Sequence, residues 1–238
     1  MTDAVPQASS ATAPTAASVP SLGPAAGCSA SAWMTLLSVL SVGLALDLWS
    51  KAWAFRTIAK EPVALTYDEV AGNPGYRLPW HESVAALPWD LLDFRLVLNH
   101  GAVFGVGQNR QRLFIMFTVV AIVVAMMFFA RWTRASSRLA HVAIGMILAG
   151  GLGNLYDRVV FGAVRDFLHM FPRWDFPFGW RWPGNRTSDI FPWVFNVADM
   201  LLLGGMGLFM IYAYRRDREE RRQLQLQLQP LRDAQPTR

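Results

Sequence analysis

Four long apolar stretches limit what this chain can fold into more than any other feature. They cover residues 33–55, 113–129, 140–155 and 190–214. Each is about as long as a helix needs to cross the ~30 Å hydrocarbon core of a bilayer, although the third carries several glycines and its apolar run is short. Only 16% of the 238 residues are charged, against roughly 25% in an average soluble domain. The sequence therefore predicts a mainly α-helical membrane protein with four transmembrane helices.

Basic residues gather beside the apolar stretches, between the second and third and after the fourth: Arg131, Arg134, Arg138, Arg215, Arg216, Arg218, Arg221 and Arg222. This positive-inside pattern predicts that the second connection and both termini are cytoplasmic. The same distribution argues against a nucleic-acid partner, although the net charge is +5. A disulfide-stabilised scaffold is excluded because Cys28 is the single cysteine.

The chain divides into three parts by composition. Residues 1–31 are rich in Ala, Pro, Ser and Thr and are expected to form a disordered tail. Residues 32–215 form the four-helix transmembrane domain, with outside connections at about 56–111 and 159–189, and residues 216–238 form a charged cytoplasmic tail.

Both outside connections carry structural patterns. Residues 92–98 alternate large apolar with mostly polar side chains, which predicts a half-buried strand and hence a small β-containing subdomain. Residues 171–180 are rich in Trp, Pro and Phe. Trp favours the boundary between membrane and water, so we expect this loop to lie on the outer membrane surface.

Several polar residues stand where a membrane disfavours them. Asp47 and Lys51 lie four apart near the end of the first stretch, which favours an interfacial ion pair with a snorkelling lysine over a catalytic role. An ionisable group inside a span is a candidate functional residue by default. The others lie at the outer end of the third stretch, just beyond it, or at the start of the fourth: Asn154, Asp157, Arg158, Asp166, Asn196 and Asp199.

Two neighbouring carboxyl groups can share one proton, so that a carboxylate activates water while a carboxylic acid polarises a carbonyl. This is the chemistry of an aspartic protease, and the spacing alone leaves open whether Asp157 or Asp166 partners Asp199. Small residues in the segment 99–105 would let a ligand approach the backbone closely. His100 has no His or Cys at ligand spacing, so we expect no metal site.

Four segments, in this order, carry a resemblance to a known family: residues 47–51, 99–105, 150–158 with 164–167, and 195–199. The chain resembles signal peptidase II, the lipoprotein signal peptidase family, over about residues 33–214. The resemblance implies an aspartic endopeptidase of the bacterial inner membrane, without a cofactor. It would cut diacylglyceryl-modified prolipoproteins on the amino side of the lipidated cysteine. Its partners would be these substrates and membrane lipids, the enzyme would be monomeric, the β-containing subdomain would be periplasmic, and the site would lie near the outer face.

Residue by residue, the resemblance assigns catalysis to Asp166 and Asp199. It makes Asp157 a structural partner and gives Asp47 and Lys51 a supporting role. The positions that contact substrate or support the site are Asn99, Gly101, Asn154, Arg158 and Asn196.

The chain departs from the family pattern in its long first outside connection, in the aromatic insertion 171–193, and at Arg165. A small apolar residue is expected at position 165; the charge there either lowers the pKa of Asp166 or faces water. A transporter or channel subunit is the main non-enzymatic alternative, but it should show inverted repeats, and we find none. A catalytically inactive relative should lack both aspartates, and both are present.

Overall fold

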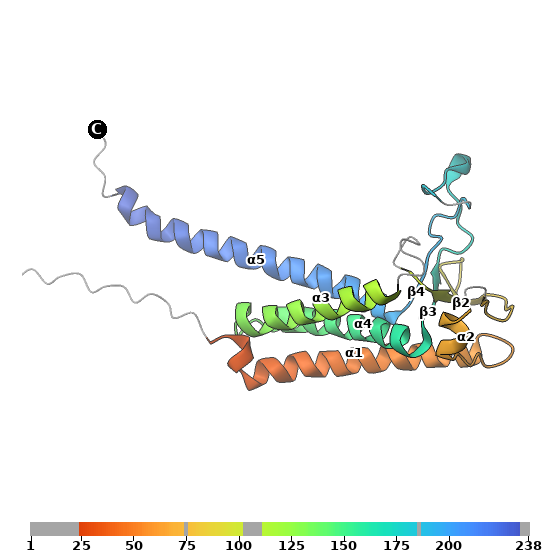
Figure 1. The fold of residues 1–238 in the computed structure, drawn as a ribbon. Helices are drawn as coiled ribbons and strands as arrows, with labels where there is room; N and C mark the ends of the chain where they lie inside the picture. The colour runs from red at the N-terminus through yellow and green to blue at the C-terminus, as the bar shows by residue number, and fades with distance from the viewer. Residues whose placement is uncertain (1–23, 74–75, 102–110, 185–186, 234–238) are drawn as a thin grey trace, which may run out of the picture.

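The computed structural model describes residues 24–73, 76–101, 111–184 and 187–233. Within these residues, four helices are long and apolar enough to cross a membrane: α1 (Ala30–Thr57), α3 (Gln111–Trp132), α4 (Arg138–Phe161) and α5 (Val197–Asp233). They form an elongated bundle with the sheet at one end (Figure 1). The prediction of a mainly helical fold with four spans is confirmed.

The fourth helix begins later than the apolar stretch from residue 190 indicates. Residues 194–195 form strand β4 (Val194–Phe195), and α5 begins only at Val197. At the other terminus, residues 1–23 of the expected disordered tail lie outside the described residues. The rest of that expected tail is ordered: it forms η1 (Ala26–Cys28) and the start of α1, and the Ala26 N–H donates to the Thr133 carbonyl at 2.9 Å.

Helix α4 lies at the centre of the bundle, and small residues let its neighbours approach it. Most residues of the α4 span are buried inside the protein, whereas very few residues of the α3 span are. A Cβ added at Gly145 would lie 3.0 Å from the Leu36 carbonyl oxygen of α1, and one at Gly150 would overlap the Ala198 carbonyl oxygen of α5. Close contact of this kind is how helices associate in lipid.

The connections outside the spans form a small sheet with the strand order β1-β2-β3-β4, every pair antiparallel: β1 (Val84–Leu87), β2 (Leu92–Asn99), β3 (Val164–Met170) and β4. The short helix α2 (Tyr67–Ala71) precedes β1 in the chain. The strand expected at 92–98 and the β-containing subdomain are confirmed. Strand β3 follows α4 directly through Gly162, whose φ of 80° suits glycine.

The aromatic insertion forms a hairpin-like arm, defined here as the described part of residues 171–193. The Phe176 N–H donates to the Ser188 carbonyl at 2.8 Å, and the Ile190 N–H donates to the Trp174 carbonyl at 2.7 Å. The short helix η3 (Pro177–Gly179) lies in this arm. Figure 1 shows the arm leaving the sheet end of the bundle and running across the direction of the helices.

Candidate active site

Asp166 and Asp199 come from two elements that meet at the sheet end of the bundle. Asp166 is the third residue of β3, where it is paired with Val97 of β2, and Asp199 is the third residue of α5. The side chain of Asn196 joins them: its Nδ2 donates to Asp166 Oδ1 at 2.5 Å, and its Oδ1 accepts the Asp199 N–H at 3.0 Å. The structure thus brings together the two aspartates that the resemblance singles out.

Asn196 and Asp199 also begin helix α5. The Asn196 N–H donates back to Asp199 Oδ2 at 3.1 Å, so each side chain binds the other residue's backbone N–H. This reciprocal arrangement is a capping box, which satisfies donors that the first helical turn leaves free. The same bonds that start α5 therefore fix the orientation of the Asp199 carboxylate.

The two carboxyl groups have different surroundings. Asp166 is 1% exposed, and burial, with the charge of Asp199 as a second cause, raises its pKa from 3.8 to about 8. The side chains of Asn196 and Asn99 bond to it and oppose this shift. Asp199 is only partly buried, and it accepts a hydrogen bond from Asn154 Nδ2 at 2.9 Å. At neutral pH, Asp166 therefore holds a proton, and the neighbouring Asp199 carboxyl group is more accessible to water.

A buried charge network supports this pair from the side of α1. Lys51 Nζ donates to Asp47 Oδ2 at 2.8 Å and to Asn154 Oδ1 at 3.0 Å, and it lies 3.3 Å from Asp157 Oδ2. The other oxygen of Asp47 accepts the Ala198 N–H at 2.8 Å. Asp47 and Lys51 are both 0% exposed, so the expected interfacial pair with a snorkelling lysine is wrong. The pair lies inside the protein and ties α1 to α4 and α5.

Asp157 is occupied by Arg165 as well as by Lys51. It accepts the Arg165 backbone N–H at 2.9 Å, and its other oxygen accepts Nε at 3.1 Å and Nη2 at 2.8 Å. Arg165 is 7% exposed and its guanidinium lies 4.2 Å from the ring centroid of Phe161. The expectation that Arg165 faces water is therefore wrong, because its guanidinium is buried against Asp157 and Phe161. Successive residues of a strand point to opposite faces, which turns Arg165 away from Asp166.

Arg158 connects the end of α4 to the end of β2. Its Nη2 donates to the Gly101 carbonyl at 3.2 Å and its Nη1 to the Asn154 carbonyl at 3.3 Å. Asn99 Oδ1 accepts the Gly101 N–H at 3.0 Å. Residues 102–105 of the glycine-containing segment lie outside the described residues. Every site residue named from the sequence belongs to one connected set of contacts.

Sequence reasoning missed two residues of this set. Gly153 is one, because a Cβ there would overlap Asp47 Oδ2. From the sequence, the glycines around it indicate only close packing between helices. Gln111 is the other, since its Nε2 donates to the Arg158 carbonyl at 2.5 Å and nothing in its sequence surroundings indicates this.

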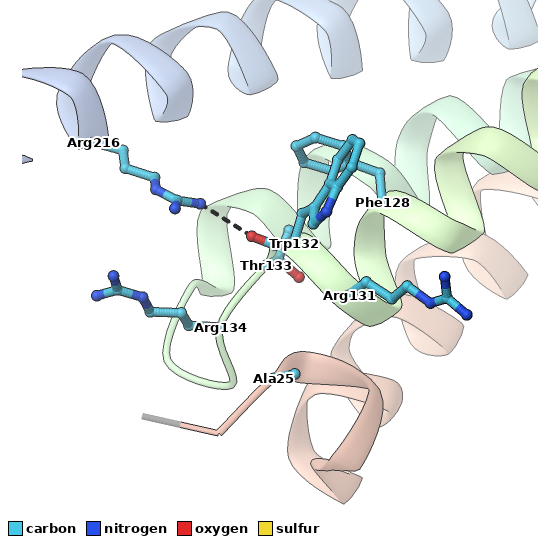
Figure 2. Close-up of a pocket in the computed structure, with 7 residues that line it drawn as sticks. All are labelled: Ala25, Phe128, Arg131, Trp132, Thr133, Arg134 and Arg216. Carbon is cyan, nitrogen blue, oxygen red and sulfur yellow. Dashed lines mark hydrogen bonds between the residues drawn. The ribbon is translucent and has the colours of Figure 1, made fainter. Parts of the chain in front are cut away.

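Two surface cavities lie apart from the aspartate pair. One, of about 460 Å³, is at the opposite end of the bundle, where Arg216 Nη1 donates to the Trp132 carbonyl at 3.0 Å (Figure 2). That bond ties α5 to the end of α3. The other, of about 610 Å³, lies between α2 and the start of α3, and Gln111 in its lining links it to Arg158.

Sequence comparisons find one family, and a structural comparison finds a similar fold. The profile described as "Signal peptidase (SPase) II" matches residues 39–215. A lipoprotein signal peptidase of Clostridium tetani is 26% identical over 188 residues, which cover 78% of this chain and 96% of the relative. One from Desulfitobacterium hafniense is 37% identical over 142 residues, or 59% of this chain and 80% of the relative. A solved bacterial membrane enzyme has a similar fold, with a TM-score of 0.56 and 23% identity over 79% of this chain and 91% of its own.

Proposed function

The chain belongs to the signal peptidase II family, the aspartic lipoprotein signal peptidases that cleave the signal peptides of prolipoproteins, and we propose that Asp166 and Asp199 are its catalytic pair. One observation carries this proposal. A single amide, that of Asn196, binds both residues and holds a buried carboxyl group beside a more accessible one.

The surroundings of the two groups assign their roles. Asp166 is the general acid, because its raised pKa keeps a proton on it at neutral pH. Asp199 is the general base: it is reachable by water and is oriented by Asn154 and Asn196. Two carboxyl groups in different environments commonly divide acid and base work in this way.

The reaction follows from these roles. Asp199 removes a proton from water as its oxygen attacks the scissile carbonyl carbon, and Asp166 gives its proton to the carbonyl oxygen. The tetrahedral intermediate then loses the amine: the C–N bond breaks, the proton held by Asp199 goes to the leaving nitrogen, and Asp166 recovers its own proton. Proton transfers of this kind contribute roughly 10²–10⁴-fold each.

The remaining site residues position the substrate. Arg158 and Asn99 hold the backbone at Gly101, beside the carboxyl pair, where an extended signal peptide would pass. Two acyl chains on the cysteine after the scissile bond stay in the hydrocarbon and hold that bond near the outer membrane surface. Binding energy from this remote lipid positions the reacting carbonyl. We propose that the enzyme is a monomer, since one chain supplies both aspartates. We also propose that both termini are cytoplasmic, because the arginines gather beside the spans on that side.

The test replaces each aspartate by the amide of the same shape. Asp166→Asn and Asp199→Asn should each lower cleavage of a diacylglyceryl-modified prolipoprotein by about 10²–10⁴-fold, measured on purified protein with an unlipidated substrate as the control. The fold should persist because an asparagine at 166 still accepts from Asn196 Nδ2.

The matched control is Asp93→Asn. Asp93 is a 0% exposed aspartate on the neighbouring strand and is paired with Arg173 at 2.9 Å, away from the catalytic pair. It should keep near-normal turnover. If a folded Asp157→Asn variant is inactive while Asp166→Asn turns over normally, the assignment of the pair is wrong.

A further inference from the structure

The aromatic arm presents large apolar side chains to its surroundings. Phe178 is 98% exposed and Trp180 is 74% exposed. Trp89, in the turn between β1 and β2, is 80% exposed, and its carbonyl accepts the Nε1–H of Trp174 in the arm at 3.2 Å. Such a concentration of exposed aromatic rings marks an interaction surface.

Other aromatic rings of the arm pack on one another. Trp182 packs on Phe176 at 5.7 Å and on Trp193 at 5.2 Å between ring centroids. The Trp182 Nε1–H donates to the Ile190 carbonyl at 2.9 Å. Trp182, at 38% exposure, is thus partly covered by its neighbours, while Phe178 and Trp180 remain far more exposed.

The base of the arm is fixed to the sheet. Arg173 pairs with Asp93 at 2.9 Å and also with Asp90, and the Phe171 N–H donates to the Leu91 carbonyl at 3.1 Å. This anchoring sets the direction in which the arm leaves the bundle. Because the arm runs across the helices at their sheet end (Figure 1), it runs along the surface of a bilayer that the helices cross.

We propose that the aromatic arm is a second membrane contact, which docks on the lipid interface of the leaflet at the sheet end. The exposed surface of α3, with Phe117 73% exposed, already faces lipid, and the arm extends that contact sideways. Residues 176–180 carry no charge, and charged residues follow on either side of them in Asp175 and Arg181. An apolar tip between polar flanks fits an interface where rings enter the acyl boundary and charges stay in water.

Site-directed fluorescence tests this contact in the full chain. Cys28 is the single cysteine, so a Cys28→Ser background carries one probe position at a time. A fluorophore at Phe178→Cys, in phosphatidylcholine–phosphatidylglycerol vesicles, should be quenched by lipids carrying a nitroxide near the headgroup at least roughly half as strongly as one at Phe117→Cys. A probe at Glu219→Cys, on the exposed charged part of α5, is the water-facing control.

A second probe position keeps both aromatic rings in place. With the label at Thr187→Cys, an exposed position on the returning side of the arm, the change Phe178→Ser with Trp180→Ser should lower lipid quenching roughly two-fold or more. Quenching at position 117 should not change.

Three outcomes would overturn the proposal. Quenching at 178 as low as at 219 would mean that the arm is in water. Shielding of position 178 from both the lipid nitroxide and aqueous iodide would mean that a protein, such as a second copy of this chain, covers it. No effect of the serine pair at Thr187 would mean that the attached probe, not the native rings, enters the lipid. None of these results depends on the catalytic assignment, which is tested by cleavage.

Discussion

Burial and the neighbouring charge of Asp199 raise the pKa of Asp166 and so keep a proton on its carboxyl group. Its pKa of about 8 predicts that kcat/KM falls as pH rises through that value, because the general acid is lost. A pH series on the purified enzyme with a lipidated fluorogenic peptide measures this limb. Activity that stays constant from neutral pH to well above 8 would contradict the role of Asp166.

The same pKa has a consequence for stability. The folded state binds this proton more tightly than the unfolded chain, in which the pKa is 3.8. Between 3.8 and about 8 the folded state therefore carries the extra proton, and stability falls as pH rises through this window. The Asp166→Asn variant should lack this part of the pH dependence of its thermal unfolding.

Arg165 contributes to the site through its buried pair with Asp157. Arg165→Gln leaves Asp157 without its guanidinium partner, and breaking a buried pair in this way costs about 3–5 kcal/mol. We expect a lower thermal midpoint in detergent, with much of the loss recovered in the double variant Arg165→Gln with Asp157→Asn. Strictly additive effects of the two changes would show that the pair is not coupled.

Single residues could be predicted from the sequence only where their chemistry conflicts with the membrane. Asp47, Lys51 and Asp199 attract attention because charges in apolar stretches need partners. The partners themselves are long-range: Lys51 reaches Asn154 in α4, and Asp47 reaches Ala198 in α5. Spacing along one helix cannot predict such contacts, so the pair inside α1 was wrongly expected at the membrane surface.

Close packing between α4 and α5 requires a residue without a side chain at Gly150. Gly150→Ala should push α5 away, because the new methyl group would overlap a backbone oxygen that cannot move. Overpacking of this kind costs about 1–3 kcal/mol, and it would also shift Asp199 and lower turnover. Thermal unfolding and cleavage of the same samples measure both effects.

Gly151→Ala is the matched control on the same helix. A Cβ there would meet its nearest neighbour, in Ile122, at 3.8 Å, which is ordinary contact. Stability and activity should be almost unchanged. Equal losses at positions 150 and 151 would mean that helix α4 resists alanine in general and that contact with α5 is not the cause.

Strand β3 carries no sequence pattern that predicts a strand. Six of its seven residues are buried, among them Arg165, Asp166 and His169, so apolar and polar positions do not alternate. Strand β2 was predictable because its pattern changes from residue to residue. The strand that carries Asp166, the proposed general acid, therefore has no alternation that would predict it.

The arginines predict the orientation of the whole molecule in the membrane. Reporter fusions between Arg131 and Arg138, and after Arg216, should report the cytoplasm. Fusions near Gly75 and Trp180 should report the opposite side, because one span, α3 or α4, separates each of these positions from the 131–138 loop. An outside signal from the loop at 131–138 would reverse the topology and move the aspartates to the cytoplasmic face.

The number of spans and the helical class were predictable at this scale because a bilayer permits few solutions for a chain with long apolar stretches. The meeting of α4, β3 and α5 around Asn196 was not predictable, since it depends on three elements that are separate in the sequence. The resemblance to the family indicates which two aspartates form the pair. Only the folded structure shows that one of them is buried and the other more accessible.

The pairing of Asp47 with Lys51 within α1 also bears on how the protein is made. The first span leaves the ribosome before α4 and α5 exist. Its two charges lie four residues apart on one helix, 2.8 Å from each other in the folded protein, so they can pair as soon as that helix forms. The span can therefore enter the bilayer without an unpaired charge. Asp47 Oδ1 gains its partner, the Ala198 N–H, only when α5 arrives. The last span to be synthesised thus completes the network and delivers Asp199, so a partly inserted chain has no assembled protease site.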